Sequence, residues 1–171
     1  MAKDEIDVSR RRLLFGFLDR VRGGEQTPMA SASTTAPMLA AANAAFGAGS
    51  FEAAAGHYRE FLKHEAENRE AHQRLGECLY RLGQYIQAKV EFERVLQKNH
   101  KDTRALLFLG LALARLERVE KAAVVWKLHF DPHNVSVQRE LNIQIALIET
   151  AGEDDKPHHA AVADAVERVL V

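Results

Sequence analysis

The feature of this sequence that most restricts its fold is an internal repetition with a period of 34 residues. When the chain is shifted against itself by that period, residues of the same kind coincide in several columns. The columns are Gly49 with Gly83, Gly76 with Gly110, Leu75 with Leu109, Ala54 with Ala88 and Ala122, Tyr58 with Phe92 and Trp126, Phe51 with Tyr85 and Val119, and Leu62 with Leu96 and Phe130. A fixed period of about 20–50 residues is typical of repeat proteins, in which similar units stack side by side.

The residue types within each unit favour a pair of helices. The chain has only 4 prolines and is rich in alanine and leucine, which lose little side-chain entropy in a helix. The small residues Gly76 and Gly110 allow the first helix of a unit to approach its partner closely. Gly49 and Gly83 fall where a residue with a positive φ ends a helix at little cost. We therefore expect each unit to be a helix-turn-helix hairpin.

A 34-residue period with these columns resembles the tetratricopeptide repeat, whose unit is such a hairpin. The resemblance covers residues 35–134, and the units are expected at about 35–68, 69–102 and 103–134. The second unit matches best. The first has Ala41-Ala42 where Leu-Gly is usual, and the third has Glu117 where a turn glycine is usual. The resemblance implies an all-α fold, a right-handed superhelix of stacked hairpins of the kind called an α-solenoid.

The rest of the chain completes the expected organisation into segments. Asp131-Pro132 shortens the second helix of the third unit, and Asn134 or Ser136 caps the next helix. The expected segments are a basic amphipathic helix at 1–24, a flexible linker at 25–34, a tetratricopeptide domain with a capping helix at 35–150, and a linker with a short C-terminal helix at 151–171.

The two C-terminal helices have recognisable faces. In the capping helix, at about 136–150, we expect the apolar face Val137, Leu141, Ile145 and Ile148 to point inward. Terminal repeats need a polar outer face, and the expected outward residues are Arg139, Glu140, Asn142, Gln144 and Glu149. In the final helix the expected apolar face is Ala161, Ala165, Val166 and Val169.

The first helices of the units line the concave face of such a superhelix, where tetratricopeptide proteins commonly bind peptides. By helical spacing, the residues expected in this partner-binding groove are Asn43, Arg74, Glu77, Tyr80, Arg81, Arg104, Leu107, Phe108, Leu111 and Arg115. Arginines outnumber carboxylates among them, and a guanidinium suits bidentate capture of a carboxylate. The alternative is a solvated helix face held by i,i+4 pairs such as Glu70–Arg74 and Glu77–Arg81.

One expected groove helix is apolar on nearly every side, over Leu106 to Leu113. A helix of this kind should be buried all round, but its neighbouring units cover only two sides. Leu107, Phe108 and Leu111 therefore need a cover on the concave side, because an exposed apolar patch usually marks a binding site. The candidates are a partner peptide, the C-terminal helix or the N-terminus of the chain.

The N-terminal helix carries an apolar stripe flanked by arginines. The stripe, which we expect to act as a docking surface, consists of Leu13, Leu14, Phe17, Leu18 and Val21. It would dock in a groove of the same chain or of a second copy, and the latter would build a homo-oligomer. The alternatives are a weak peripheral contact with a membrane and recognition by another protein because the helix imitates an export signal. Residues 9–14 also resemble a twin-arginine export signal, but the apolar run that follows is shorter than the roughly 7–15 residues such signals need.

Composition and motifs argue against several classes of function. The formal net charge of −1 provides no field for nucleic acid, and no apolar run approaches the roughly 20 residues that span a bilayer. Cys78 is the single cysteine and cannot form an internal disulfide, which favours a cytoplasmic location. The eight histidines form no cluster at metal-ligand spacing, so we expect no metal and no cofactor. No catalytic motif is present, and we expect no enzyme.

These observations predict a non-catalytic adaptor or assembly factor that binds a peptide or partner protein in the groove of its repeats. One alternative is a self-assembling scaffold, in which the N-terminal helix docks into the groove of its own or another copy. A further alternative, suggested only by the export-like motif, is an accessory factor in the maturation of an exported redox enzyme.

Overall fold

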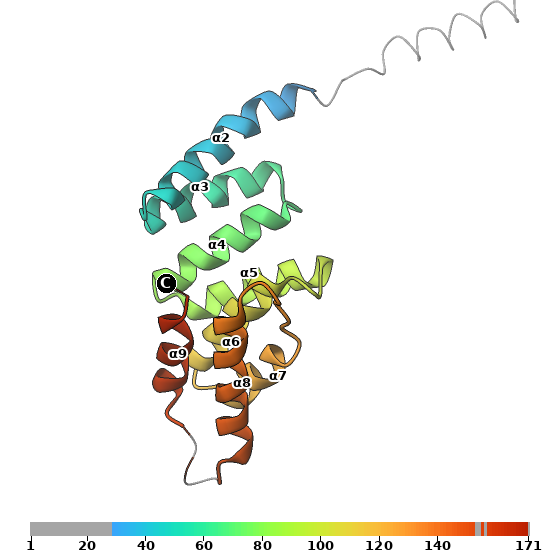
Figure 1. The fold of residues 1–171 in the computed structure, drawn as a ribbon. Helices are drawn as coiled ribbons and strands as arrows, with labels where there is room; N and C mark the ends of the chain where they lie inside the picture. Colours follow the sequence, from blue (N-terminus) through green and yellow to red (C-terminus); the bar gives the residue numbers. More distant parts are fainter. Residues whose placement is uncertain (1–28, 153–154, 156, 171) are drawn as a thin grey trace, which may run out of the picture. The chain divides into compact units, whose positions relative to one another are not determined.

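The structure, a computed structural model, describes residues 29–152, 155 and 157–170, and these residues form helices and no strand. The helices are α2 (Met29–Gly47), α3 (Phe51–His64), α4 (Arg69–Arg81), α5 (Tyr85–Lys98), α6 (Thr103–Arg115), α7 (Val119–Trp126), α8 (Val135–Thr150) and α9 (His159–Arg168). From α3 to α8 each helix packs on the next, and α9 returns to pack on α6 and α8 (Figure 1). The predicted all-α solenoid of consecutive hairpins is therefore confirmed.

The close helix contacts depend on the two small residues of the repeat columns. A Cβ atom added to Gly76 of α4 would lie 2.7 Å from Cε1 of Phe92 in α5. One added to Gly110 of α6 would overlap the indole of Trp126 in α7. The Trp126 Nε1 donates a hydrogen bond of 3.1 Å to the Leu107 carbonyl, so the ring is fixed as well as buried. Glycine is required in α4 and α6 because the aromatic ring of the partner helix occupies the place of a side chain.

The turns between the paired helices share one backbone conformation. Gly49 and Gly83 have φ values of 72° and 73°, and Glu117 has a φ of 62° at the equivalent place in the third hairpin. The left-handed region favours glycine, so Glu117 holds the same turn at a steric cost. The second helix of this hairpin, α7, has 8 residues against 14 in α3 and α5, which confirms the predicted shortening.

Side-chain caps define where three of the helices begin. Asn68 and Asp102 accept hydrogen bonds from the backbone N–H groups of the third residues of α4 and α6, each at 3.0 Å. Asn134 accepts the corresponding bond of α8 at 3.2 Å. An oxygen at this position satisfies one of the N–H groups that a helix start leaves unpaired. Of the two caps predicted for α8, the structure therefore uses Asn134.

The start of α2 differs from the expected linker. This helix begins at Met29, inside the segment 25–34 for which a flexible linker was predicted, and Pro37 lies within it. The prediction relied on Ser, Thr and Pro, but alanines alternate with them, and alanine is the strongest helix former. The predicted amphipathic helix at 1–24 and its stripe Leu13 to Val21 lie outside the described residues.

The capping helix α8 has the predicted inner face but a different outer face. Val137, Leu141 and Ile148 are buried, as expected. Gln144, predicted to point outward, is buried and donates to Glu140 at 2.8 Å. The outer side instead exposes apolar residues; those exposed on and just before α8 are Leu128, Phe130, Val135, Ile143 and Leu147. Arg139, Asn142 and Glu149 are exposed as predicted, so the outer face is partly polar, and Ile143 and Leu147 share it.

The final helix, α9, buries a face that is rotated from the predicted one. Ala165 and Val166 are buried as expected, but Ala161 is exposed, and Val162 and Ala163 are buried in its place. His158 caps the helix by accepting the N–H of Ala160 at 3.3 Å. The buried face of α9 joins the same hydrophobic core as α6, so the C-terminal helix is part of the folded domain.

Candidate partner-binding groove

The apolar segment of α6 that needed a cover is buried in the structure. The exposed fractions of Leu107, Phe108 and Leu111 are 7%, 5% and 0%. Helix α9 packs against α6, and its Val162 and Val166 lie in the same core (Figure 1). Of the three covers considered, the structure therefore shows the C-terminal helix.

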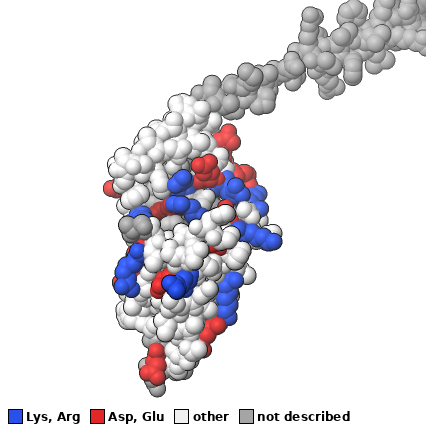
Figure 2. Space-filling view, in the orientation of Figure 1, with Lys and Arg blue, Asp and Glu red and all other residues white. Residues whose placement is uncertain are grey.

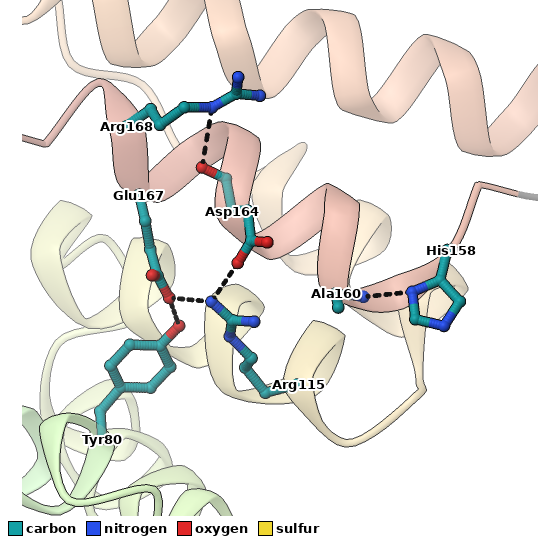
Figure 3. A network of polar contacts seen from close by, with 7 residues as sticks. All are labelled: Tyr80, Arg115, His158, Ala160, Asp164, Glu167 and Arg168. Atoms are coloured by element: carbon teal, nitrogen blue, oxygen red, sulfur yellow. Dashed lines mark hydrogen bonds and ion pairs between the residues drawn. The ribbon is translucent and has the colours of Figure 1, made fainter.

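A polar network joins α9 to the predicted groove (Figure 3). Arg115, at the end of α6, donates from Nη2 to Asp164 at 2.6 Å and to Glu167 at 2.9 Å. The hydroxyl of Tyr80, on α4, donates to the same Glu167 oxygen. Two residues predicted to bind a partner, Tyr80 and Arg115, thus hold the carboxylates of the chain's own helix.

Burial and this network set the protonation of both donors. Burial raises the pKa of Tyr80, and its hydrogen bond to Glu167 raises that pKa further. Burial alone lowers the pKa of Arg115, but its contacts with Tyr80, Glu167 and Asp164 outweigh burial and raise that pKa. Tyr80 therefore remains a neutral donor and Arg115 a cation, as a carboxylate-holding site requires. The Arg115 Nε is buried and has no hydrogen-bond partner among the residues that the structure describes.

A second ion pair crosses between α4 and α6. Glu77 is buried, and both of its oxygens accept from Arg104, Oε1 from Nε at 2.5 Å and Oε2 from Nη2 at 2.6 Å. The hydrogen bond with Glu77 raises the pKa of Arg104. Glu77 thus pairs across helices with Arg104 and not with Arg81, the i,i+4 partner considered from the sequence.

A pocket of about 400 Å³ lies between α4, α6 and the start of α8, and it is called the groove pocket below. Its lining residues are Arg81, Thr103, Arg104, Leu107, Phe108, His129, Asp131, Asn134, Val137 and Leu170. Four of the ten sequence-predicted groove residues are among them. Arg81 is exposed and, among the described residues, has no hydrogen-bond or ion-pair partner. The pocket therefore presents a free guanidinium beside a floor formed by Leu107 and Phe108, within a lining that also contains His129, Asp131 and Asn134.

Two other predicted groove residues lie elsewhere, where α2 meets α3 and α4. Asn43 accepts a hydrogen bond of 2.6 Å from Tyr58 of α3. The guanidinium of Arg74 lies 4.7 Å from the ring centroid of Phe46. These residues do not line the groove pocket. Residues 35–47 of α2 carry no charge, and in Figure 2 the surface of this helix is white, while acidic and basic side chains are interspersed over the helices that follow.

Sequence reasoning missed the contribution of the chain after α7 to this site. Asp164 and Glu167 were not predicted, although their i,i+3 spacing beside an apolar face is visible in the sequence. His129 and Asn134 line the groove pocket from the segment between α7 and α8. The one repeat column that reaches this segment, Leu62 with Leu96 and Phe130, does not indicate its position, because Phe130 is exposed while Leu62 and Leu96 pack against the core.

The described residues form neither a metal-binding cluster nor a membrane-spanning helix. Within 29–152, 155 and 157–170, no three His, Cys, Asp or Glu side chains gather at a spacing that would hold a metal ion. In the same part of the chain, no helix has the length and apolar character needed to cross a membrane.

The helical hairpins define a helical-repeat protein of the α-solenoid class. Residues 45–105 match the family model described as "Tetratricopeptide repeat". Together with the consecutive hairpins, this match supports a tetratricopeptide-repeat protein, and the resemblance drawn from the repeat columns is confirmed. A comparison with curated proteins finds no match.

Proposed function

We propose that this protein is a non-catalytic adaptor or assembly factor that binds an acidic segment of a partner polypeptide at the groove pocket. The tetratricopeptide domain supports a role in protein–protein interaction. The observation that carries the finer proposal is the pocket itself, which brings Arg81 together with Arg104, Leu107 and Phe108.

The chemistry of the pocket suits a carboxylate next to an apolar side chain. The guanidinium of Arg81 can bind a carboxylate along either of its two edges. In Arg104, Nε and Nη2 already donate to Glu77, and Nη1 makes no bond to Glu77. Arginine binds planar carboxylates through paired hydrogen bonds. An exposed ion pair alone contributes only about 0–1 kcal/mol, so apolar contact with the floor of the pocket must supply most of the binding free energy.

The proposal is tested by capture of partners on the full-length chain. Arg81→Glu reverses the charge at the mouth of the pocket without breaking a contact in the described structure. Arg59→Glu is the matched control, because Arg59 is exposed on α3 and does not line the groove pocket. We expect Arg81→Glu to recover at least tenfold less of a partner that the unmodified chain and Arg59→Glu both retain. If all three chains retain the same partners equally, the groove pocket is not the binding site.

The alternative of a self-assembling scaffold receives less support. It requires the stripe Leu13 to Val21 to fill an apolar groove, but α9 already covers the apolar segment of α6. Deletion of residues 1–24 tests it, because a scaffold of this kind would change from an oligomer to a monomer in sedimentation.

A further inference from the structure

We infer that α9 occupies a docking site for an acidic amphipathic helix of a partner protein, which takes the place of α9 on α4 and α6. This inference rests on the proposed function, since it adds a second part of the same groove and names the kind of partner that it fits. The residues that carry it are Tyr80 and Arg115 of the repeats, and Asp164 and Glu167 of α9.

Charge complementarity indicates what kind of helix the site accepts. Asp164 and Glu167 are three residues apart, so they lie on one side of α9, one turn from each other. Both point toward the Arg115 guanidinium, and Glu167 also faces the Tyr80 hydroxyl (Figure 3). The site thus holds a cation and a neutral donor at the positions of two carboxylates on a helix. A partner helix needs acidic residues at the same i,i+3 spacing.

The fit of α9 to this site is incomplete. A single nitrogen of Arg115, Nη2, donates to both carboxylates, while Nε is buried and finds no partner within the described part of the chain. An unpaired buried donor is unfavourable, and Nε with Nη2 forms the edge of the guanidinium that binds a carboxylate through two parallel bonds. A partner carboxylate placed along this edge would satisfy the donor that α9 leaves free.

The apolar contact of α9 is also modest. The side chains that it buries are those of Val162, Ala163, Ala165 and Val166, and Val169 and Leu170, just after the helix, are partly buried against the same core. The opposing segment of α6 carries leucines and a phenylalanine, and Phe108 also packs against Tyr80, with ring centroids 5.7 Å apart. A helix of 10 residues is too short to be stable alone in water. Helix α9 therefore depends on this contact, and it leaves the site without unfolding the repeats.

The first test measures α9 in the unmodified full-length chain by amide hydrogen exchange. We expect the amides of α9 to exchange at least tenfold faster than those in the middle of α6, because α9 opens locally while the repeats stay folded. Equal protection of α9 and α6 would show that α9 is a permanent part of the core and would overturn the inference.

The second test supplies a helix from outside. The probe is a fluorescent peptide with the sequence of residues 157–171, and its binding to full-length chains is followed by anisotropy. In the receptor Val162→Asp with Val166→Asp, two carboxylates on the buried face of α9 prevent its docking. The control receptor, Val90→Asp with Val124→Asp, carries the same changes at exposed positions. We expect the probe to bind the first receptor at least tenfold more tightly than the control.

A neutral version of the probe, with Asp164→Asn and Glu167→Gln, separates charge recognition from apolar adhesion. We expect it to bind at least tenfold more weakly than the acidic probe. Equal binding of the two probes, or no binding to either receptor, would overturn the inference. If the Arg81→Glu variant still loses its partner in that case, the proposed function stands and only the role of α9 fails.

Sedimentation of the unmodified chain identifies the alternative occupant. The inference requires the mass per particle to stay constant as concentration rises. A concentration-dependent dimer that the Val162→Asp and Val166→Asp changes abolish would show that α9 of a second copy fills the site, and the partner helix proposed here would be wrong.

Discussion

At the scale of single residues, the third hairpin contains a turn that its sequence does not suit. Glu117 has a φ of 62°, a region in which the first two hairpins use Gly49 and Gly83. An L-residue in this conformation places its Cβ close to the following carbonyl oxygen, at a cost of roughly 1–2 kcal/mol. The side chain of Glu117 is exposed and lies 3.8 Å from His159, a contact too weak to offset that cost.

Replacement of Glu117 by glycine is therefore expected to stabilise the protein. We predict that Glu117→Gly raises the free energy of unfolding by about 1 kcal/mol, because relief of strain exceeds the extra chain entropy of glycine. Urea denaturation of the two chains measures the difference. The opposite change at the equivalent turn, Gly83→Ala, should lower the stability. A decrease with Glu117→Gly would contradict the conformation assigned to this turn.

Gly110 lies at a close contact between α6 and α7. We predict that Gly110→Ala lowers the free energy of unfolding by about 3 kcal/mol or more, because the added methyl group overlaps the indole of Trp126 and forces α6 and α7 apart. Gly56 is the matched control. It lies within α3 with open space around it, so Gly56→Ala should gain up to about 1 kcal/mol from helix propensity. Thermal melts that show equal effects for the two variants would contradict this packing.

His72 links α4 to α5 through a buried pair. Its Nδ1 lies 2.6 Å from Glu91, and its Nε2 lies 2.8 Å from the Ala66 carbonyl. The hydrogen bond with Glu91 raises the pKa of His72 above its ordinary value of 6.5, although burial opposes the shift. The folded state therefore binds the proton more tightly than the unfolded state.

The raised pKa of His72 predicts a pH dependence of stability. The stabilisation is fully present below the unfolded pKa of about 6.5 and is lost as the pH rises through the higher folded pKa. We expect the free energy of unfolding to fall as the pH is raised through this window, and His72→Gln to remove that part of the dependence. Equal pH profiles for the two chains would show that His72 is not protonated in the folded state.

At the scale of the helices, the repeat columns predicted the hairpins because the columns are packing contacts. Gly76 and Gly110 recur because Phe92 and Trp126 occupy the space beside them. A short α7 was predicted from Asp131-Pro132, but the helix already ends at Trp126, before that proline is reached. The glycine and aromatic columns repeat along the chain, so one sequence was enough to detect them.

Helices outside the repeats were predicted less well. The buried face of α9 was placed one residue off, because Ala161 and Val162 are both apolar and only contact with α6 decides between them. For the segment before residue 35, the prediction gave more weight to Ser, Thr and Pro than to alanine. It therefore missed the start of α2. The position of α9 on α6 follows from tertiary packing, for which the sequence has no periodic signal.

The hydrogen bond between α4 and α9 gives a prediction about α9 alone. Tyr80→Phe removes the donor to Glu167 while it keeps the ring, and it should weaken α9 docking by about 1–3 kcal/mol. Amide exchange of residues 159–168 should rise, while that of α6 should change little. Tyr85→Phe is the control, because Tyr85 packs against Tyr80 but no hydrogen bond of its hydroxyl occurs among the described residues. A uniform loss of protection in all helices would contradict local docking.

At the scale of the whole molecule, a solenoid of three hairpins and a capping helix brings distant segments into one site. The groove pocket combines residues from α4, α6 and α8, and it also touches Leu170 beyond α9. Leu170 thus lies beside the surface on which we propose that a partner binds. The domain therefore has two adjoining parts of one groove, an open basic pocket and a part that α9 fills.

The central claim is that this groove holds a partner polypeptide, and quantitative capture on full-length chains tests it most directly. We predict that partners retained by the unmodified chain are also retained by Arg59→Glu and are reduced at least tenfold on Arg81→Glu. Circular dichroism of the three chains should be the same, because both arginines are exposed. Equal retention on Arg81→Glu and Arg59→Glu would contradict the account.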